Sequence, residues 1–531
     1  MRRPGSLKPA RWAALAALLL GGILGLLSLR PPRPAPVTAA GFSALRAKAH
    51  IDAIAQHPHP VWDQASLEPV RAYLRTSLEG LGLPVEVIRH EPVTDRQGHR
   101  YPLVNLAAAI PGRSGRSILL VAHYDSAPLP GGSLGAADDG FGVATLLELA
   151  RLMARERNLE NGVRFLFTDA EETGLLGAIA ELKERPEAYR DVELVVNLEA
   201  RGVRGPAVMF ETGARNLEAI RLYRKAHRPF AYSFAVDVYR RMPNGTDLTV
   251  FLKKGYQGLN FAVLDDLAAY HMPLDAPGQI SLASLQHYGE QVLPVVRAFA
   301  TDPAFARPGA LQARQDAVYF SWVPGVFLAW SKGLDRVLCW LVVAACLVFA
   351  ATERGRGRLR LGAAFRWALV WLVLAFLALG AGLGTSWLAG KATGIRWRFA
   401  YMPGVPGETW ITWALLLGLG ALAFLLARRS RDRSPLGGAL LLNLLWLALV
   451  AVKVPGGTFL VSVPLLAVLA TQVAGRALRP LAVLGPVLIV SLYVPVLHLV
   501  GLALTFGALG LVLFVAAFPV VLAATALPET P

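Results

Sequence analysis

Seven long apolar runs fill the C-terminal part of the chain, so this sequence does not fold as a single soluble domain. The runs cover residues 336–352, 367–389, 409–427, 436–452, 458–474, 481–500 and 502–526. Most of them approach the roughly 20 residues that a helix needs to cross the hydrocarbon core of a bilayer. Residues 12–29 form another uncharged run of this kind. We therefore expect an α-helical multi-span membrane domain over residues 336–531, with the lipid bilayer as its surroundings.

The net charge of +16 is distributed as in a membrane protein. Arginines gather in alternate loops between the apolar runs: five from Arg354 to Arg366, four from Arg428 to Arg433, then Arg476 and Arg479. Because positively charged loops stay in the cytoplasm, we expect a cytoplasmic N-terminus and an extracytoplasmic segment at residues 41–305. Basic clusters with interleaved aromatic residues, which are typical of nucleic-acid-binding surfaces, are not evident, so no nucleic-acid partner is expected.

The ends of this extracytoplasmic segment are defined by composition. Residues 1–30 are expected to form an N-terminal transmembrane anchor, and the proline-rich residues 31–40 a stiff spacer. A cleaved signal peptide is the alternative, but the apolar run is long for one and the small-residue site after it is weak. Residues 306–335 are interpreted as a linker at the membrane interface, because the aromatic stretch Val318–Trp330 contains Pro324 and is too short to span.

Strand-like and helix-like patterns alternate through residues 41–305. Strands are expected at residues 103–110, 117–122, 163–168, 194–198, 207–210 and 259–263, and helices at 141–155, 175–183, 216–226 and 282–300. This alternation predicts the α/β class, a three-layer sandwich with a mostly parallel central sheet. Sheets of this kind carry their ligand sites at the carboxyl ends of the strands.

Acidic residues and histidines recur just after these expected strands. They are His123 and Asp125, Asp138 and Asp139, Asp169, Glu171 and Glu172, Glu199, and His271. Gathered at one sheet edge, so many acids would repel one another unless cations neutralise them. Both cysteines, Cys339 and Cys346, lie in an apolar run, so oxygen and nitrogen ligands remain, which suit zinc or alternatively manganese or cobalt. The number of ligands predicts two ions about 3.5–4 Å apart that share a carboxylate.

The segments that carry these residues, in their order along the chain, resemble the co-catalytic di-zinc aminopeptidase family. That family also includes glutamate carboxypeptidase, glutaminyl cyclase and the transferrin receptor. The matching segments are AHYDS, GAADDGFGVA, TDAEETGLLGA, VNLEARG, PNGTDLTVFLKKGYQGLNFAV and YHMPLDAPGQI. They cover most of residues 100–285. The combination of such a domain with several spans looks like the membrane-anchored branch of vacuolar membrane protease and endoplasmic-reticulum metallopeptidase.

The resemblance implies five metal ligands. His123 and Glu199 are expected to hold the first zinc, Glu172 and His271 the second, and Asp138 to bridge both. Many soluble members have aspartate where Glu199 stands, whereas the longer acid is found in the membrane branch.

The resemblance also implies three catalytic residues. Glu171 is expected to act as the general base, taking a proton from the bridging water and passing it to the leaving amine. Asp125 is expected to orient the imidazole of His123. Tyr270 is a candidate donor to the tetrahedral oxyanion, and packing of the strand end is its alternative role.

The expected function is therefore that of a membrane-anchored zinc-dependent exopeptidase, and within that class an aminopeptidase, acting on peptide substrates. A catalytically inactive receptor-like protein is disfavoured because all ligands and the base are present, and glutaminyl cyclase chemistry because the carboxylate set is doubled. A transporter with an attached peptidase-like domain stays open, since prolines interrupt several spans. The Arg-, Ala-, Leu- and Gly-rich composition suggests a bacterial source, hence the periplasm or cell exterior; in a eukaryote, an organelle lumen would replace it.

Overall fold

The computed structural model describes residues 9–94, 98–128, 132–430, 432–473 and 483–526. The chain divides into two compact units, residues 30–331 and residues 1–29 with 332–531. The basic N-terminal residues 1–8, the expected loop arginines Arg431, Arg476 and Arg479, and the facing ends of the expected spans 458–474 and 481–500 lie outside the described residues.

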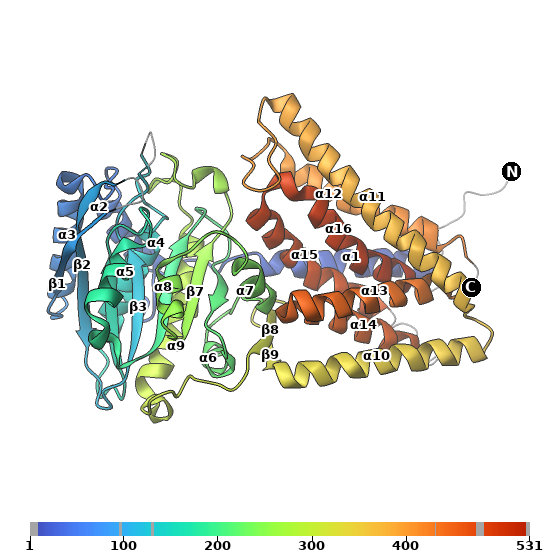
Figure 1. Ribbon diagram of the computed structural model, residues 1–531, viewed down its shortest axis with the longest axis horizontal. Coiled ribbons are helices and arrows are strands. Elements are labelled where there is room, and N and C mark those ends of the chain that lie inside the picture. Colours follow the sequence, from blue (N-terminus) through green and yellow to red (C-terminus); the bar gives the residue numbers. More distant parts are fainter. Residues whose placement is uncertain (1–8, 95–97, 129–131, 431, 474–482, 527–531) are drawn as a thin grey trace. The chain divides into compact units, whose positions relative to one another are not determined.

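Residues 30–331 are built on a seven-stranded sheet (Figure 1). Its strands are β1 (Glu86–Thr94), β2 (Arg100–Ile110), β3 (Ser117–His123), β4 (Gly162–Thr168), β5 (Val192–Ala200), β6 (Val208–Thr212) and β7 (Gly258–Val263). The spatial order is β1-β2-β4-β3-β5-β7-β6. The four central strands β4, β3, β5 and β7 run parallel, and β1, β2 and β6 pair antiparallel at the edges. The expected α/β fold with a mostly parallel core is confirmed.

Helices cover both faces of this sheet. They are α2 (Ala44–Ile54), α3 (Gln64–Glu79), α4 (Gly140–Met153), α5 (Leu176–Glu184), α6 (Leu217–Tyr223), α7 (Ser233–Tyr239), α8 (Asp247–Lys253) and α9 (Leu282–Thr301). Every residue of β3 is buried. Ile118 and Leu120 pack into one apolar cluster with α2, α4 and α9, whereas Leu119 and Val121 pack into a second cluster with α5 and α8. Successive side chains of a strand point to opposite faces of the sheet. When both faces are covered, both sets of side chains are buried, so the sequence of the strand is a continuous apolar run.

The boundary after the sheet differs from the expected one. Instead of a linker, residues 317–331 form a hairpin of β8 (Ala317–Ser321) and β9 (Phe327–Ser331). All of β8 is buried, and Tyr319 belongs to the same apolar cluster as α9. The connecting turn contains Pro324 and Gly325, whose φ of +80° favours glycine. The aromatic stretch thus contributes to the core of residues 30–331.

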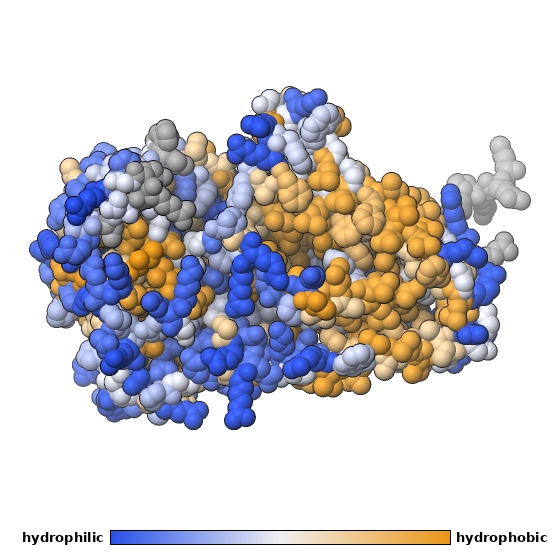
Figure 2. Space-filling view, in the orientation of Figure 1, coloured by the Kyte–Doolittle hydropathy of each residue, from blue (hydrophilic) through white to orange (hydrophobic). Residues whose placement is uncertain are grey.

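The second unit is helical. Its helices are α1 (Pro9–Ser28), α10 (Lys332–Gly355), α11 (Leu361–Thr393), α12 (Glu408–Ala427), α13 (Ser434–Lys453), α14 (Phe459–Val473), α15 (Leu484–Leu504) and α16 (Leu509–Ala526). Among the described residues, seven helical segments from Lys332 onward are long and apolar enough to cross a membrane, as expected. Figure 2 shows their apolar side chains at the surface, and Trp410 of α12 is 80% exposed. Side chains of this kind are stable against lipid, so this is an integral membrane protein.

The junction of β4 and α5 yields a stability prediction. A Cβ atom on Gly177 would lie 2.3 Å from the carbonyl oxygen of Asp169 and 2.7 Å from Asn105 Oδ1. Gly177→Ala therefore has to displace backbone, and overpacking of this kind costs about 1–3 kcal/mol. We expect the full chain in detergent to unfold several degrees lower, measured by thermal denaturation. Gly41→Ala is the matched control, because its Cβ would meet no atom within 4 Å. Equal midpoints for the two variants would contradict the prediction.

Candidate metal centre

The carboxyl ends of the parallel strands bring the expected site residues together. His123 is the last residue of β3, and Glu199 is the last but one of β5. Asp138 precedes α4, Glu172 follows β4, and His271 follows β7 after a short 3-10 turn. Asp139, the second acid of the ADDG segment, has a different role: it is the N-cap of α4, where its Oδ1 accepts the N–H of Gly142 at 2.9 Å.

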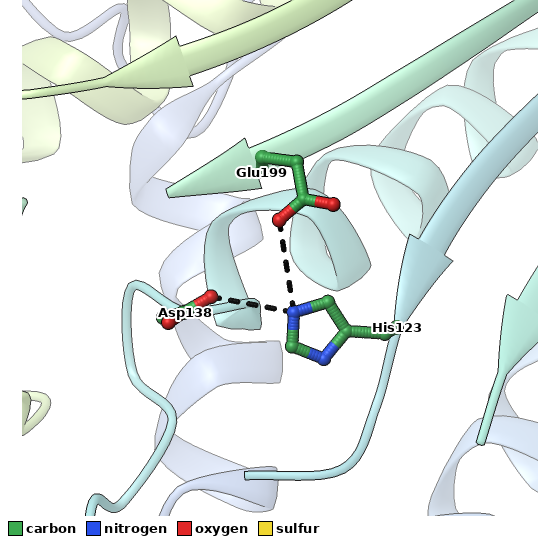
Figure 3. A group of neighbouring side chains, drawn as sticks. All are labelled: His123, Asp138 and Glu199. Carbon is green, nitrogen blue, oxygen red and sulfur yellow. Dashed lines mark hydrogen bonds and ion pairs between the residues drawn. The ribbon is translucent and has the colours of Figure 1, made fainter. Parts of the chain in front are cut away.

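A first group of ligand atoms forms around His123 (Figure 3). His123 Nε2 lies 3.3 Å from Asp138 Oδ1 and 3.8 Å from Glu199 Oε2. All three residues are buried, and one donor atom from each lies within 4.8 Å of the others. Figure 3 shows both carboxylates turned toward the same ring nitrogen. This arrangement offers one nitrogen and two carboxylate oxygens to a single point.

A second group shares Asp138 with the first. His271 Nε2 lies 3.3 Å from Asp138 Oδ2 and 3.0 Å from Glu172 Oε2. Donor atoms of Asp138, Glu172 and His271 also lie within 4.8 Å of one another. Asp138 therefore turns one carboxylate oxygen toward each histidine.

Unsatisfied atoms show that these residues fit cations. Among the described residues, the buried atoms Asp138 Oδ2, Glu172 Oε1 and His271 Nε2 have no hydrogen-bond partner. Buried polar groups left without a partner are costly, and an ion bound between them would remove that cost. Nitrogen and carboxylate donors without thiolate suit zinc, manganese or cobalt. The donor chemistry and the unsatisfied atoms agree with a divalent metal at this edge.

The electrostatics of the site point the same way. Burial raises the pKa of Glu172 to about 7 and that of Glu199 to about 8, and in both cases the charge of Asp138 adds to the effect. For His271, burial is outweighed by the carboxylates of Asp138 and Glu172, which raise the pKa to about 10. The cluster thus has more negative charge than its own cations balance, which is the condition under which a bound metal ion is favoured.

Asp125 joins the loops that carry the two groups. Its Oδ1 lies 3.3 Å from His123 Nδ1, and the same oxygen accepts the backbone N–H of Glu171 at 3.1 Å. Its Oδ2 accepts the backbone N–H of Glu172 at 3.4 Å. Asp125 thereby contacts His123 Nδ1, the ring nitrogen that faces away from Asp138, and its backbone carbonyl oxygen lies 3.0 Å from that nitrogen.

Glu171 and Tyr270 lie beside the two groups without belonging to them. Burial, followed by the charge of Glu199, raises the pKa of Glu171 well above its usual range. The ring of Tyr270 stacks on that of His271 with centroids 3.7 Å apart. The pKa of Tyr270 is also raised, first by burial and then by Asp138.

Two further side chains shape the site, and the sequence did not single them out. Asp275 is buried and accepts the backbone N–H groups of Ala137 at 2.7 Å and Asp138 at 3.2 Å, so it fixes the loop that carries the shared carboxylate. Its position in YHMPLDAPGQI, four residues after His271, was an available signal. Arg71 of α3 donates to Asp169 Oδ2 at 2.7 Å, and no local motif marks it.

Comparison with known proteins supports the motif analysis. Residues 105–296 match "Peptidase family M28". The chain is 29% identical over 273 residues to a putative endoplasmic reticulum metallopeptidase 1-A of Caenorhabditis elegans, which covers 50% of this chain and 30% of that protein. It is 33% identical over 225 residues to a vacuolar membrane protease of Lachancea thermotolerans, which covers 42% of this chain and 22% of that protein. The chain thus spans less than a third of the length of these curated relatives.

The solved structures that match this chain include a zinc-dependent exopeptidase of Parabacteroides distasonis. It is 20% identical, with a TM-score of 0.39, and the match covers 48% of this chain and 98% of that one. A glutaminyl cyclase of Porphyromonas gingivalis gives 19% identity, a TM-score of 0.40, and coverage of 49% and 99%. The family match at residues 105–296 contains all eight expected site residues and confirms the resemblance drawn from the motifs. Residues 105–296 of this integral membrane protein thus match the peptidase family M28.

Proposed function

We propose that this protein is a membrane-anchored hydrolase of peptide bonds that uses two divalent metal ions, with zinc as the first choice, and acts as an aminopeptidase. One observation carries the proposal: two groups of donor atoms share Asp138 at the carboxyl edge of a parallel sheet, and a further acid, Glu171, lies beside them without joining either. That is the inventory needed for metal-assisted hydrolysis, namely ligands for two ions and a separate base.

The geometry supports the following assignment of roles. His123, Glu199 and Asp138 would hold one ion, and Asp138, Glu172 and His271 the other. When bound, the ions lower the pKa of a water molecule and polarise the carbonyl of the substrate. Glu171 then accepts a proton from that water and delivers it to the departing amine nitrogen.

Asp125 and Tyr270 would assist this chemistry without binding metal. Asp125 would fix the tautomer and orientation of His123, because its backbone carbonyl oxygen, 3.0 Å from Nδ1, can only accept a hydrogen bond and its carboxylate lies 3.3 Å from the same nitrogen. Nε2 is then left directed at the donor group. Tyr270, packed on His271, is placed beside the ligands, where its hydroxyl would donate to the oxyanion that forms during attack.

The membrane topology is part of the proposal. Arg360 pairs with Asp432 at 2.9 Å, and the backbone N–H of Arg433 donates to the carbonyl oxygen of Arg358 at 3.0 Å. The loops between α10 and α11 and between α12 and α13 therefore lie on the same side of the membrane. Because both are rich in arginine, that side is proposed to be the cytoplasm, with the N-terminus inside and the peptidase domain outside.

The metal content is the first test. The purified full chain is expected to contain about two divalent ions per molecule by elemental analysis, and to lose hydrolysis of aminoacyl-naphthylamides on chelation. His123→Ala should lower the metal content. His90→Gln is the matched control, because His90 is equally buried between Glu181 (2.6 Å) and Glu184 (2.8 Å) but makes hydrogen bonds with both ring nitrogens. A wild-type chain with only traces of metal would rule the proposal out.

The neighbouring acids Glu171 and Glu172 give the second test. Glu171→Gln keeps shape and hydrogen bonding but removes the proton acceptor, so turnover should fall about 10²–10⁴-fold while KM and metal content stay near wild type. Glu172→Gln should instead lose close to one metal equivalent, and added zinc should restore part of the activity. If Glu171→Gln lost metal and Glu172→Gln kept it, the two roles would be exchanged. Wild-type turnover in both variants would refute the hydrolase.

Reporter fusions test the topology. A reporter fused after Arg360 is expected to read cytoplasmic, and one fused after Gly112 to read extracytoplasmic, because arginine-rich loops are retained inside. A fusion after Arg396, in the loop between α11 and α12, is the control and should read outside. The same side for the fusions after Arg360 and Gly112 would contradict the arrangement.

A further inference from the structure

Three buried polar side chains lie next to one another on three adjacent strands of the sheet. Asn197 of β5 is the register partner of Asn260 of β7, and Asn260 is in turn the register partner of Glu211 of β6. Their exposed fractions are 1%, 0% and 4%. We call Asn197, Asn260 and Glu211 the amide ladder. The mechanism above uses none of its members.

The amide ladder ends on a proposed metal ligand. Asn197 Nδ2 donates to Glu199 Oε1 at 3.0 Å and to Asn260 Oδ1 at 3.1 Å. Asn260 Nδ2 donates to Glu211 Oε2 at 3.0 Å and to Thr246 Oγ1 at 2.8 Å. Each amide group therefore uses both of its N–H donors, and the hydrogen bonds form a continuous chain from β6 to Glu199.

The direction of this chain is fixed at the Glu211 end. A carboxylate only accepts hydrogen bonds, so Asn260 has to turn its NH2 group toward Glu211. The carbonyl oxygen of Asn260 then faces Asn197, which has to donate a hydrogen bond to it from its own NH2 group. Because that group also reaches Glu199, the nearer oxygen of Glu199 always meets a donor. A reversed amide would place two oxygens against each other.

This chain fixes which oxygen of Glu199 is free. With Oε1 held by Asn197, Oε2 is the oxygen that lies 3.8 Å from His123 Nε2, in the first donor group. Asn197 and Glu199 are two residues apart on β5, so both point to the same face of the sheet. A glutamate has one more rotatable bond than an aspartate, so its carboxylate needs such a restraint to keep one orientation.

Sheet stability alone does not account for the amide ladder. Its neighbours on the same strands, Val196 and Leu198 of β5 and Leu259 and Phe261 of β7, point to the opposite face and are buried and apolar. Replacing a buried polar network by apolar side chains of similar size is often neutral for stability. The N–H donors of both amides are all used, although the buried Asn197 Oδ1 has no partner among the described residues. A row of amides whose hydrogen bonds lead to one ligand instead matches the outer partners that orient ligands in metal sites.

We propose that the amide ladder orients the Glu199 carboxylate and thereby sets the affinity of the metal position formed by His123, Asp138 and Glu199. The inference rests on the proposed function, since it concerns the same metal centre. Asn197, Asn260 and Glu211 are positioning residues, because they act through Glu199.

Zinc affinity is the measurement that tests it. The metal-depleted full chain in detergent is titrated with zinc against a chromophoric chelator. The Glu172→Gln background weakens the other metal position, so the titration reports the position of Glu199. Loss of outer partners typically weakens metal binding 10–100-fold. We expect a loss of about that size for Asn197→Leu and about tenfold for Glu211→Leu.

Two further variants separate orientation from general stability. Glu211→Gln keeps an acceptor for Asn260 in one of its two amide orientations, so it should retain most of the affinity that Glu211→Leu loses. Gln291→Leu removes another fully buried amide, which donates to the carbonyl oxygen of Ala207 at 2.7 Å and lies outside the amide ladder. It should lower the unfolding temperature and leave zinc affinity unchanged.

The outcomes are distinct. Wild-type affinity in both Asn197→Leu and Glu211→Leu would overturn the inference while leaving the proposed function intact. Equal weakening by Gln291→Leu would also overturn it, since stability alone would then explain the effect. A wild-type chain that binds no zinc would contradict the proposed function itself. If Asn197→Leu does not fold, the comparison of Glu211→Leu with Glu211→Gln decides, because it leaves the direct partner of Glu199 in place.

Discussion

The carboxylate of Asp138 is the point on which the candidate centre depends, because each of its oxygens faces a different histidine. Oδ1 lies toward His123 and Oδ2 toward His271, at 3.3 Å in both cases. Such sharing works only if the backbone of Asp138 is held still. Asp275 does this by accepting the N–H of Asp138 and that of Ala137. The helix α4 begins immediately afterwards, capped by Asp139.

A rigid framework is needed because the buried carboxylates repel one another. Each acid of the centre stands at the end of a different parallel strand or in the loop after it, so the sheet fixes their separations. Arg71 also stabilises this edge of the sheet. It donates to Tyr124 and to Asp169, each at 2.7 Å, and so connects the loop after β3 to the loop after β4. The amide ladder would supply the corresponding restraint for Glu199.

Water surrounds one unit of the chain and lipid the other, and the apolar side chains of the two units are distributed differently. In residues 30–331 the apolar side chains turn inward, so β3 is apolar from Ile118 to Ala122 and buried along its whole length. In the helical unit apolar side chains also turn outward, as on α12, where buried residues are few. The same hydrophobic effect produces both patterns, because lipid removes the penalty for an apolar exterior.

The sequence by itself determined the features that arise from local pattern: the apolar runs that span, the alternation of strands and helices, and the set His123, Asp138, Glu171, Glu172, Glu199 and His271, which is ordered by recognisable segments. Contacts between distant segments were decided only by the tertiary structure. Arg71 and Asp169 are 98 residues apart and Asn260 and Glu211 are 49 residues apart, and neither pair forms a motif. The hairpin at 317–331 was not anticipated for the same reason: a short aromatic stretch is equally suited to a membrane interface and to a protein core, and only the tertiary structure shows Tyr319 buried in the large apolar cluster of residues 30–331.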